Sequence, residues 1–120
     1  MEKTIKIGNK EYLMKSSAYT QFKYKNDTGR TLIKDLTSIG KELGKSQKEE
    51  EALENFDELD DFIILSLRIA YIMCMEAKSI SGSFEEFLMG IDTYLDNLEW
   101  IDEVVELAIS PLSRGNVQAH

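Results

Sequence analysis

The chain begins with a segment in which apolar and polar residues alternate, a pattern typical of a half-buried β-strand. Gly8-Asn9 then supplies a two-residue turn of the kind that joins antiparallel strands. Folding back across this turn sets three pairs opposite one another: Ile7–Lys10, Lys6–Glu11 and Ile5–Tyr12. The pattern predicts a β-hairpin over residues 1–15, and its apolar face must be covered by helices or by another chain.

Apolar residues spaced three and four apart predict helices through the rest of the chain. Ser83 and Glu86 form a capping box that starts one of them, and Pro111 follows the end of the last. The stretch from Phe62 to Met75 is apolar on all sides, which indicates a buried central helix. The expected helices run from about residue 17 to 29, 32 to 44, 56 to 77, 83 to 98 and 99 to 109.

Together these elements predict a mainly α protein, in which an N-terminal β-hairpin precedes a bundle of about five helices around a buried central helix. We expect one domain over residues 1–112. The polar stretch 45–54 reads as a flexible connection or a frayed helical extension, and residues 113–120 as a disordered tail. A chain of this size buries about two thirds of its unfolded surface, so it needs no metal or disulfide to fold.

Charge is divided unevenly along the chain. Residues 1–48 hold 11 Lys and Arg against 5 Asp and Glu, whereas residues 49–120 hold 3 against 17, which gives a net charge of -8. Two explanations stay open: solvated faces that partly neutralise each other, or poles through which copies attract or a partner is steered. This acidic balance disfavours nucleic acid as a partner. The longest apolar run has 14 residues, fewer than the roughly 20 that a membrane span needs, so we also expect no membrane association.

No arrangement of residues predicts catalysis. His120, the only histidine, is the last residue, and Cys74, the only cysteine, lies in the most apolar helix, where thiols usually serve packing. The spacings of metal sites and phosphate-binding loops are absent from the sequence. The expectation is a protein without enzymatic activity, metal or cofactor.

Protein binding remains as the expected activity. Candidate contacts to a partner or to a second copy are Ile5, Ile7 and Tyr12 of the hairpin together with Met89 and Trp100. Methionine adapts to irregular surfaces and tryptophan is frequent at interface hot spots, although side chains of both kinds lie in a core more often than at an interface.

Arg68 is the most informative polar residue because it interrupts the apolar central helix. A guanidinium in such a place needs a carboxylate or a path to solvent. We expect a buried salt bridge, to Asp92 or Glu106, with recognition of a partner as the alternative.

The chain opens with IKIGNKEYLMK, continues with a short aromatic helix that holds Tyr19, Phe22 and Tyr24, and then reaches Leu32-Ile33-Lys34-Asp35-Leu36. In these segments it resembles the start of the phage tail assembly chaperones of Gram-positive hosts. The remainder is similar in outline, with an acidic connection, a long apolar helix containing Ala70-Tyr71, a Phe-Glu-Glu-Phe-Leu helix start and a closing acidic helix.

This resemblance implies a non-enzymatic chaperone that coats the helical tape measure protein of a long-tailed phage or prophage. Such a protein acts in the host cytoplasm, helps to recruit tail-tube subunits, forms homo-oligomers and is absent from the mature virion. The family has no motif of binding residues to carry over. The alternative is a small acidic helical adaptor or regulatory protein that binds one folded partner.

Overall fold

The structure is a computed structural model, and it describes residues 1–45 and 56–112 of the 120-residue chain. It is mainly helical with an N-terminal two-stranded hairpin, as the sequence predicts. The predicted connection beyond Lys45 and the predicted tail 113–120 lie outside the described residues. The elements in order are β1 (Glu2–Ile7), β2 (Lys10–Lys15), α1 (Ala18–Thr28), α2 (Leu32–Lys45), α4 (Phe56–Glu76), α5 (Phe84–Met89) and α6 (Glu99–Ile109).

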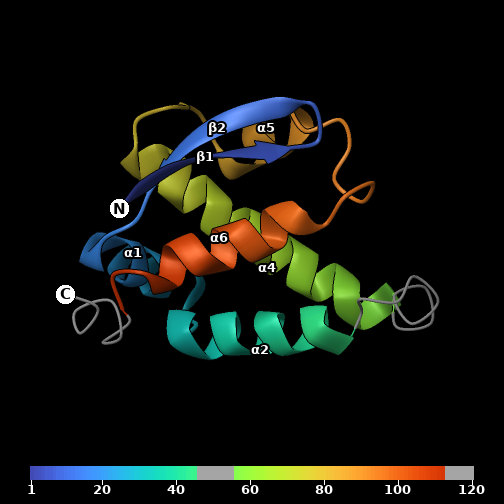
Figure 1. Ribbon diagram of the computed structural model, residues 1–120. Coiled ribbons are helices and arrows are strands. Elements are labelled where there is room, and N and C mark those ends of the chain that lie inside the picture. The colour runs from blue at the N-terminus through green and yellow to red at the C-terminus, as the bar shows by residue number, and fades with distance from the viewer. Residues whose placement is uncertain (46–55, 113–120) are drawn as a thin grey trace.

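Helix α4 is the centre of the arrangement and contacts every other helix as well as β2. Figure 1 shows α4 passing diagonally behind α6, with the hairpin above this pair and α2 below it. Helix α1 follows the hairpin and lies at one end of the molecule, against α4 and α2. No helix within the described ranges has the length and apolar character to cross a membrane.

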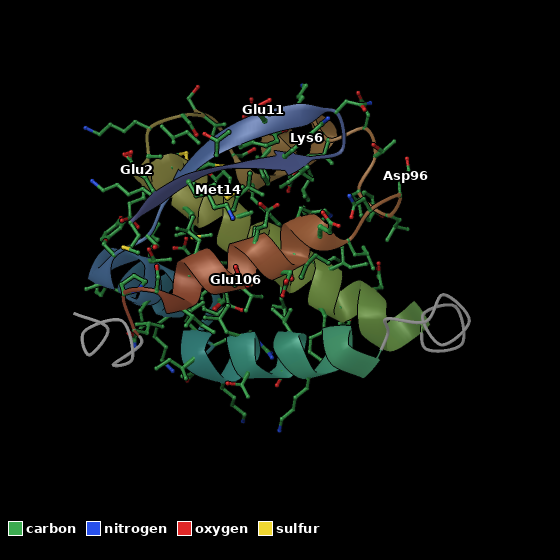
Figure 2. All side chains as sticks on the ribbon, viewed as in Figure 1. Glu2, Lys6, Glu11, Met14, Asp96 and Glu106 are labelled. Carbon is green, nitrogen blue, oxygen red and sulfur yellow. The ribbon has the colours of Figure 1, made fainter. Side chains whose placement is uncertain are left out.

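The hairpin has the predicted register, with Ile7 opposite Lys10, Lys6 opposite Glu11 and Ile5 opposite Tyr12. Its apolar face lies on the helices of the same chain. Ile5, Ile7 and Met14 are fully buried, and Figure 2 shows Met14 between the hairpin and the helices. Because this face is covered within one molecule, the hairpin belongs to the core.

The turn of the hairpin rests directly on a distant loop. Gly8 has a φ of 63°, and a Cβ atom at this position would lie 2.1 Å from the carbonyl oxygen of Thr93. Glycine is therefore required twice here, once for the left-handed backbone and once for the close approach of two chain segments.

The helix predicted from residue 83 to 98 is wrong in its second half. The capping box of Ser83 and Glu86 starts α5 as expected, but α5 ends at Met89 and an irregular loop runs on to α6. In this loop the carbonyl of Tyr94 accepts a 2.9 Å hydrogen bond from Nε1 of Trp100, and Oδ1 of Asn97 accepts a 2.9 Å bond from the N–H of Glu99. These contacts and the close approach of Gly8 to Thr93 stabilise an irregular loop, although the apolar residues of this segment have helical spacing.

Candidate protein-binding groove

Polar contacts fix the first turn of α1 to the last turn of α4. Ser17 caps α1 by accepting the N–H of Tyr19, and Thr20 accepts the N–H of Ser17. Both hydroxyls also donate to Glu76, at 2.5 Å from Ser17 Oγ and 2.6 Å from Thr20 Oγ1. The carboxylate of Glu76 thus anchors the start of α1 on the central helix.

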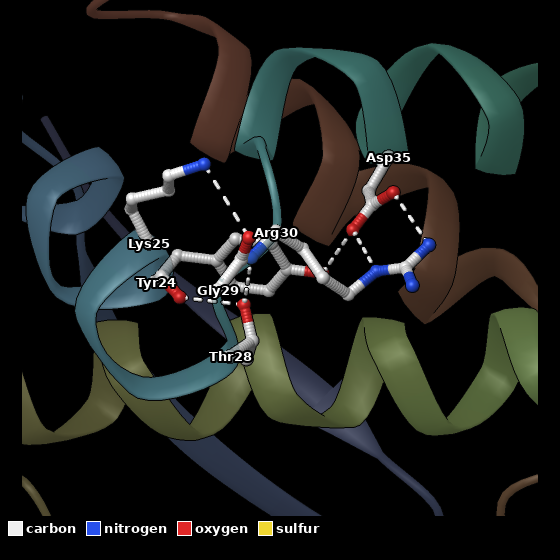
Figure 3. Close-up of polar contacts among 6 residues, drawn as sticks. All are labelled: Tyr24, Lys25, Thr28, Gly29, Arg30 and Asp35. Carbon is white, nitrogen blue, oxygen red and sulfur yellow. Dashed lines mark hydrogen bonds and ion pairs between the residues drawn. The ribbon is translucent and has the colours of Figure 1, made fainter.

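The second half of α1 is anchored to α2 by a buried carboxylate. The hydroxyl of Tyr24 donates to Asp35 at 2.6 Å, and Arg30 donates from Nε and a terminal nitrogen at 2.7 and 3.0 Å (Figure 3). Tyr24 is fully buried and Asp35 is only 4% exposed. Burial alone raises the pKa of Asp35, but the hydrogen bonds from Arg30 and Tyr24 outweigh it and lower that pKa overall. Burial and the bond to Asp35 raise the pKa of Tyr24.

Helices α1 and α4 border a groove of about 520 Å³ that the start of α5 also lines. The side chains that line it come from one face of each helix, because they are spaced three and four apart. Each lining stripe runs from its first residue to one eight positions later, which is about 12 Å of helix. Helix α1 contributes Tyr19, Lys23 and Asp27, helix α4 contributes Arg68, Tyr71, Ile72, Met75 and Glu76, and the start of α5 contributes Ser83 and Phe84.

Large apolar side chains are exposed around this groove. Tyr19 is 50% exposed, Met75 is also exposed, and Phe22, one turn further along α1, is 65% exposed. The rings of Tyr19 and Phe22 lie 6.1 Å apart, centroid to centroid. A cluster of exposed aromatic and methionine side chains beside a groove is typical of a protein-binding surface.

The floor of the groove is rigid because its aromatic rings pack on one another. Tyr71 lies 5.5 Å from Phe84 and 5.6 Å from Phe87, and Phe87 in turn meets Tyr12 of the hairpin at 5.4 Å. The hydroxyl of Tyr71 donates to the carbonyl of Gly82 at 2.7 Å, which ties the floor to the turn before α5. The groove therefore has a preformed base.

Arg68 lies in this groove, and the predicted salt bridge is not found. Among the described residues no carboxylate pairs with it; Asp92 is exposed on the loop after α5, and Glu106 on the outer face of α6 (Figure 2). Instead its guanidinium carbon lies 4.7 Å from the centre of the Phe84 ring. Its Nε atom is buried without a hydrogen-bond partner. Arg68 is thus held by an aromatic ring while part of its hydrogen-bonding capacity is unused.

Three of the predicted contact residues are corrected by their positions. Ile5 and Ile7 are buried under the hairpin and Trp100 is 2% exposed in the core, so none of them presents a surface to a partner in this fold. Tyr12 is half-buried against Phe87. Only Met89 is freely accessible, at 76% exposed.

No family model, curated protein or solved structure matches the chain.

Groups with reactive chemistry do not converge in the described part of the chain. Cys74 is buried, and burial raises the pKa of its thiol to about 12, so it stays protonated at neutral pH. Within residues 1–45 and 56–112, no three His, Cys, Asp or Glu side chains are placed to hold a metal ion. His120 lies outside the described residues.

The exposed aromatic residues of α1 were missed as binding candidates, although the sequence carries a signal for them. Tyr19 and Tyr24 are five residues apart and so lie on different faces of one helix. A short helix at the surface of a small domain buries one face, and Tyr24 occupies it. The aromatic residues on the other face, Tyr19 and Phe22, are therefore the ones that this pattern predicts to be exposed and available for binding.

Proposed function

We propose that this protein is a non-enzymatic assembly chaperone that binds the helical tape measure protein of a long-tailed phage. The observation that carries the binding of a helix is the groove between α1 and α4, with Tyr19 and Met75 exposed in it and Phe22 beside Tyr19. The identity of the partner comes from the resemblance of the sequence to phage tail assembly chaperones. An amphipathic helix laid into such a groove covers apolar surface on both partners, which is a common mode of peptide recognition.

The dimensions of the groove suit a helical ligand. Its two walls are helical stripes about 12 Å long, which corresponds to roughly two turns of a bound helix. A site of this size engages a short stretch of a long helical protein, so many copies are needed to cover it. The proposed role therefore includes homo-oligomers along the tape measure protein. What the resemblance implies adds recruitment of tail-tube subunits in the host cytoplasm. It also includes departure before the virion matures.

Co-expression with the tape measure protein of the same phage or prophage tests this proposal. We expect a soluble complex with several copies of the chaperone per tape measure chain, measured by size-exclusion chromatography with light scattering. An insoluble tape measure protein and no complex would contradict the proposal. A complex with one copy only would favour the adaptor that binds a single folded partner.

A matched pair of variants connects the complex to the groove. Replacing Tyr19 and Phe22 with serine removes two exposed aromatic side chains, and each such loss weakens a hot-spot contact by about tenfold or more. The control is Ile33→Ser on α2, which removes an apolar side chain that is as exposed as Tyr19, at 50% each, but lies outside the groove. The control variant should bind like the wild type.

A further inference from the structure

We propose that Arg68 makes the groove selective for a partner helix that carries a carboxylate. This inference rests on the proposed function, because it takes the groove to be the site where a helix docks. It commits to one occupant: an amphipathic helix with an aspartate or glutamate among its apolar residues.

The case begins with the unused donors of Arg68. Its Nε atom is covered by the chain and has no hydrogen-bond partner among the described residues, while the side chain as a whole is only half-buried, beside Tyr71, Ile72 and Phe84. The terminal nitrogens are therefore the donors that an acceptor in the groove can reach, and partial burial makes a charged hydrogen bond to them stronger than one to an ordinary surface cation.

The carboxylates already in the groove are committed elsewhere. Asp27 pairs with Lys23 at 3.1 Å, one turn apart on α1. Glu76 accepts the hydroxyls of Ser17 and Thr20 and lies eight residues from Arg68, about 12 Å along α4. Arg68 is therefore the cation of the groove that lacks an anionic partner among the described residues, and charge complementarity calls for a carboxylate from outside.

The position of Phe84 explains why the acceptor is a carboxylate. The ring lies against the guanidinium, with 4.7 Å between the guanidinium carbon and the ring centre. A ring in this position restricts the orientation of the planar group, whose N–H donors point outward in its own plane. A carboxylate matches these parallel donors in a way that a single hydroxyl or amide oxygen does not.

The test uses a defined probe, a displayed library of amphipathic helical peptides about 15 residues long, the length at which isolated helices become stable. In every peptide, leucine occupies one face of the helix. The library varies each position that flanks this face among Glu, Gln, Lys and Ser. Selection on the wild-type protein should enrich Glu at one flanking position. Selection on Arg68→Met should not enrich Glu, whereas Lys41→Met, which removes an exposed cation on α2 outside the groove, should select the same peptides as the wild type.

The best peptide then gives a quantitative result. Changing its Glu to Gln should weaken binding to the wild-type protein by about ten- to a hundredfold, as expected for a hydrogen-bonded charge pair. On Arg68→Met the same change should matter by less than about threefold. The melting temperature of Arg68→Met should change little, because no hydrogen bond within the described chain is lost and only the contact with the Phe84 ring is weakened. Arg68→Lys should recover part of the preference for Glu.

The outcomes separate this inference from the proposed function. If no peptide is selected, or if Glu is enriched on Arg68→Met as strongly as on the wild type, the inference is wrong. If the tape measure protein binds the Arg68→Met variant with the same affinity as the wild type, this inference is wrong and the proposed chaperone role is unaffected. If this protein selects helices that carry Glu but does not bind the tape measure protein, the chaperone role is wrong and this inference stands.

Discussion

The hairpin and α1 both pack against α4, but different kinds of contact hold them there. The hairpin buries Ile5, Ile7 and Met14 completely and seats its turn on the backbone of Thr93. Helix α1 is held by hydroxyl and carboxylate groups at Glu76 and Asp35, while Tyr19 and Phe22 remain exposed. Apolar packing predominates at the hairpin, where Ser79 also donates to the carbonyl of Leu13, and polar anchors predominate at α1, where the ring of Tyr24 is also buried.

This difference shows where a small protein can keep apolar side chains available for binding. An apolar face that is buried for stability is not available to a partner. An element fixed by satisfied hydrogen bonds can leave aromatic residues in solvent without losing its position. The polar anchors of α1 are therefore what keeps the groove open and its walls in place.

The largest expected effect comes from removing the hairpin, residues 1–15. Truncating a buried Ile or Met costs about 2–5 kcal/mol each, and three such losses approach the whole stability of a typical domain, about 5–15 kcal/mol. We expect no cooperative melting transition by circular dichroism. Leu13→Ser, on the exposed face of the same hairpin, serves as the control and should melt close to the wild type.

A truncated protein that still melts cooperatively near the wild-type temperature would contradict this comparison. It would mean that the hairpin stabilises the helices little and is free to act in assembly.

A second prediction compares two glycines that both have positive φ. Gly8→Ala introduces a Cβ atom 2.1 Å from the carbonyl oxygen of Thr93, whereas Gly29→Ala, after α1, meets nothing within 4 Å. Gly29→Ala carries only the backbone strain, about 1 kcal/mol. Gly8→Ala must also push two backbone segments apart, and we expect about 3 kcal/mol from urea denaturation. Equal losses would show that the turn is not seated on the loop.

Local patterns were sufficient to predict most of the fold. The turn at Gly8-Asn9 fixed the hairpin register, and the cap at Ser83 fixed the start of α5, because both depend on residues close in sequence. The loop before α6 depends instead on Trp100 reaching back to Tyr94 and on Gly8 reaching Thr93. Such contacts between distant segments leave no trace in the spacing of apolar residues.

The candidate site was harder to predict for the same physical reason. An apolar strand face indicates that other residues cover it, but it does not indicate whether those residues belong to the same chain. For Ile5 and Ile7 they do. Arg68 was recognised as unusual from its apolar neighbours. Whether a carboxylate reaches it depends on the packing of α1, α5 and α6, which the sequence pattern does not specify.

A stability effect slightly smaller than that of Gly8→Ala is expected at the polar anchor between α1 and α2. Asp35→Ala leaves the buried hydroxyl of Tyr24 without its acceptor and Arg30 without its partner, and we expect a loss of about 2–3 kcal/mol in the free energy of unfolding. Asp35→Asn is the matched control: it keeps one acceptor oxygen for Tyr24 and Arg30 Nε, but removes the charge and places an amide donor where Oδ1 accepted from the terminal nitrogen of Arg30. Its loss should be smaller than that of Asp35→Ala, because the hydroxyl of Tyr24 keeps its acceptor.

The pH dependence of this loss separates an anchoring carboxylate from simple packing. The folded protein lowers the pKa of Asp35 because the bonds from Arg30 and Tyr24 outweigh its burial, so the ionised form is favoured on folding. Its stabilisation is complete above the pKa of an unfolded aspartate, about 4, and disappears as the pH falls through the lower folded value. The difference between wild type and Asp35→Asn should therefore be constant near neutral pH and shrink below about pH 4. If the difference in unfolding free energy between wild type and Asp35→Asn stays the same down to pH 2, the loss comes from packing. Helix α1 would then be held mainly by packing, like the hairpin.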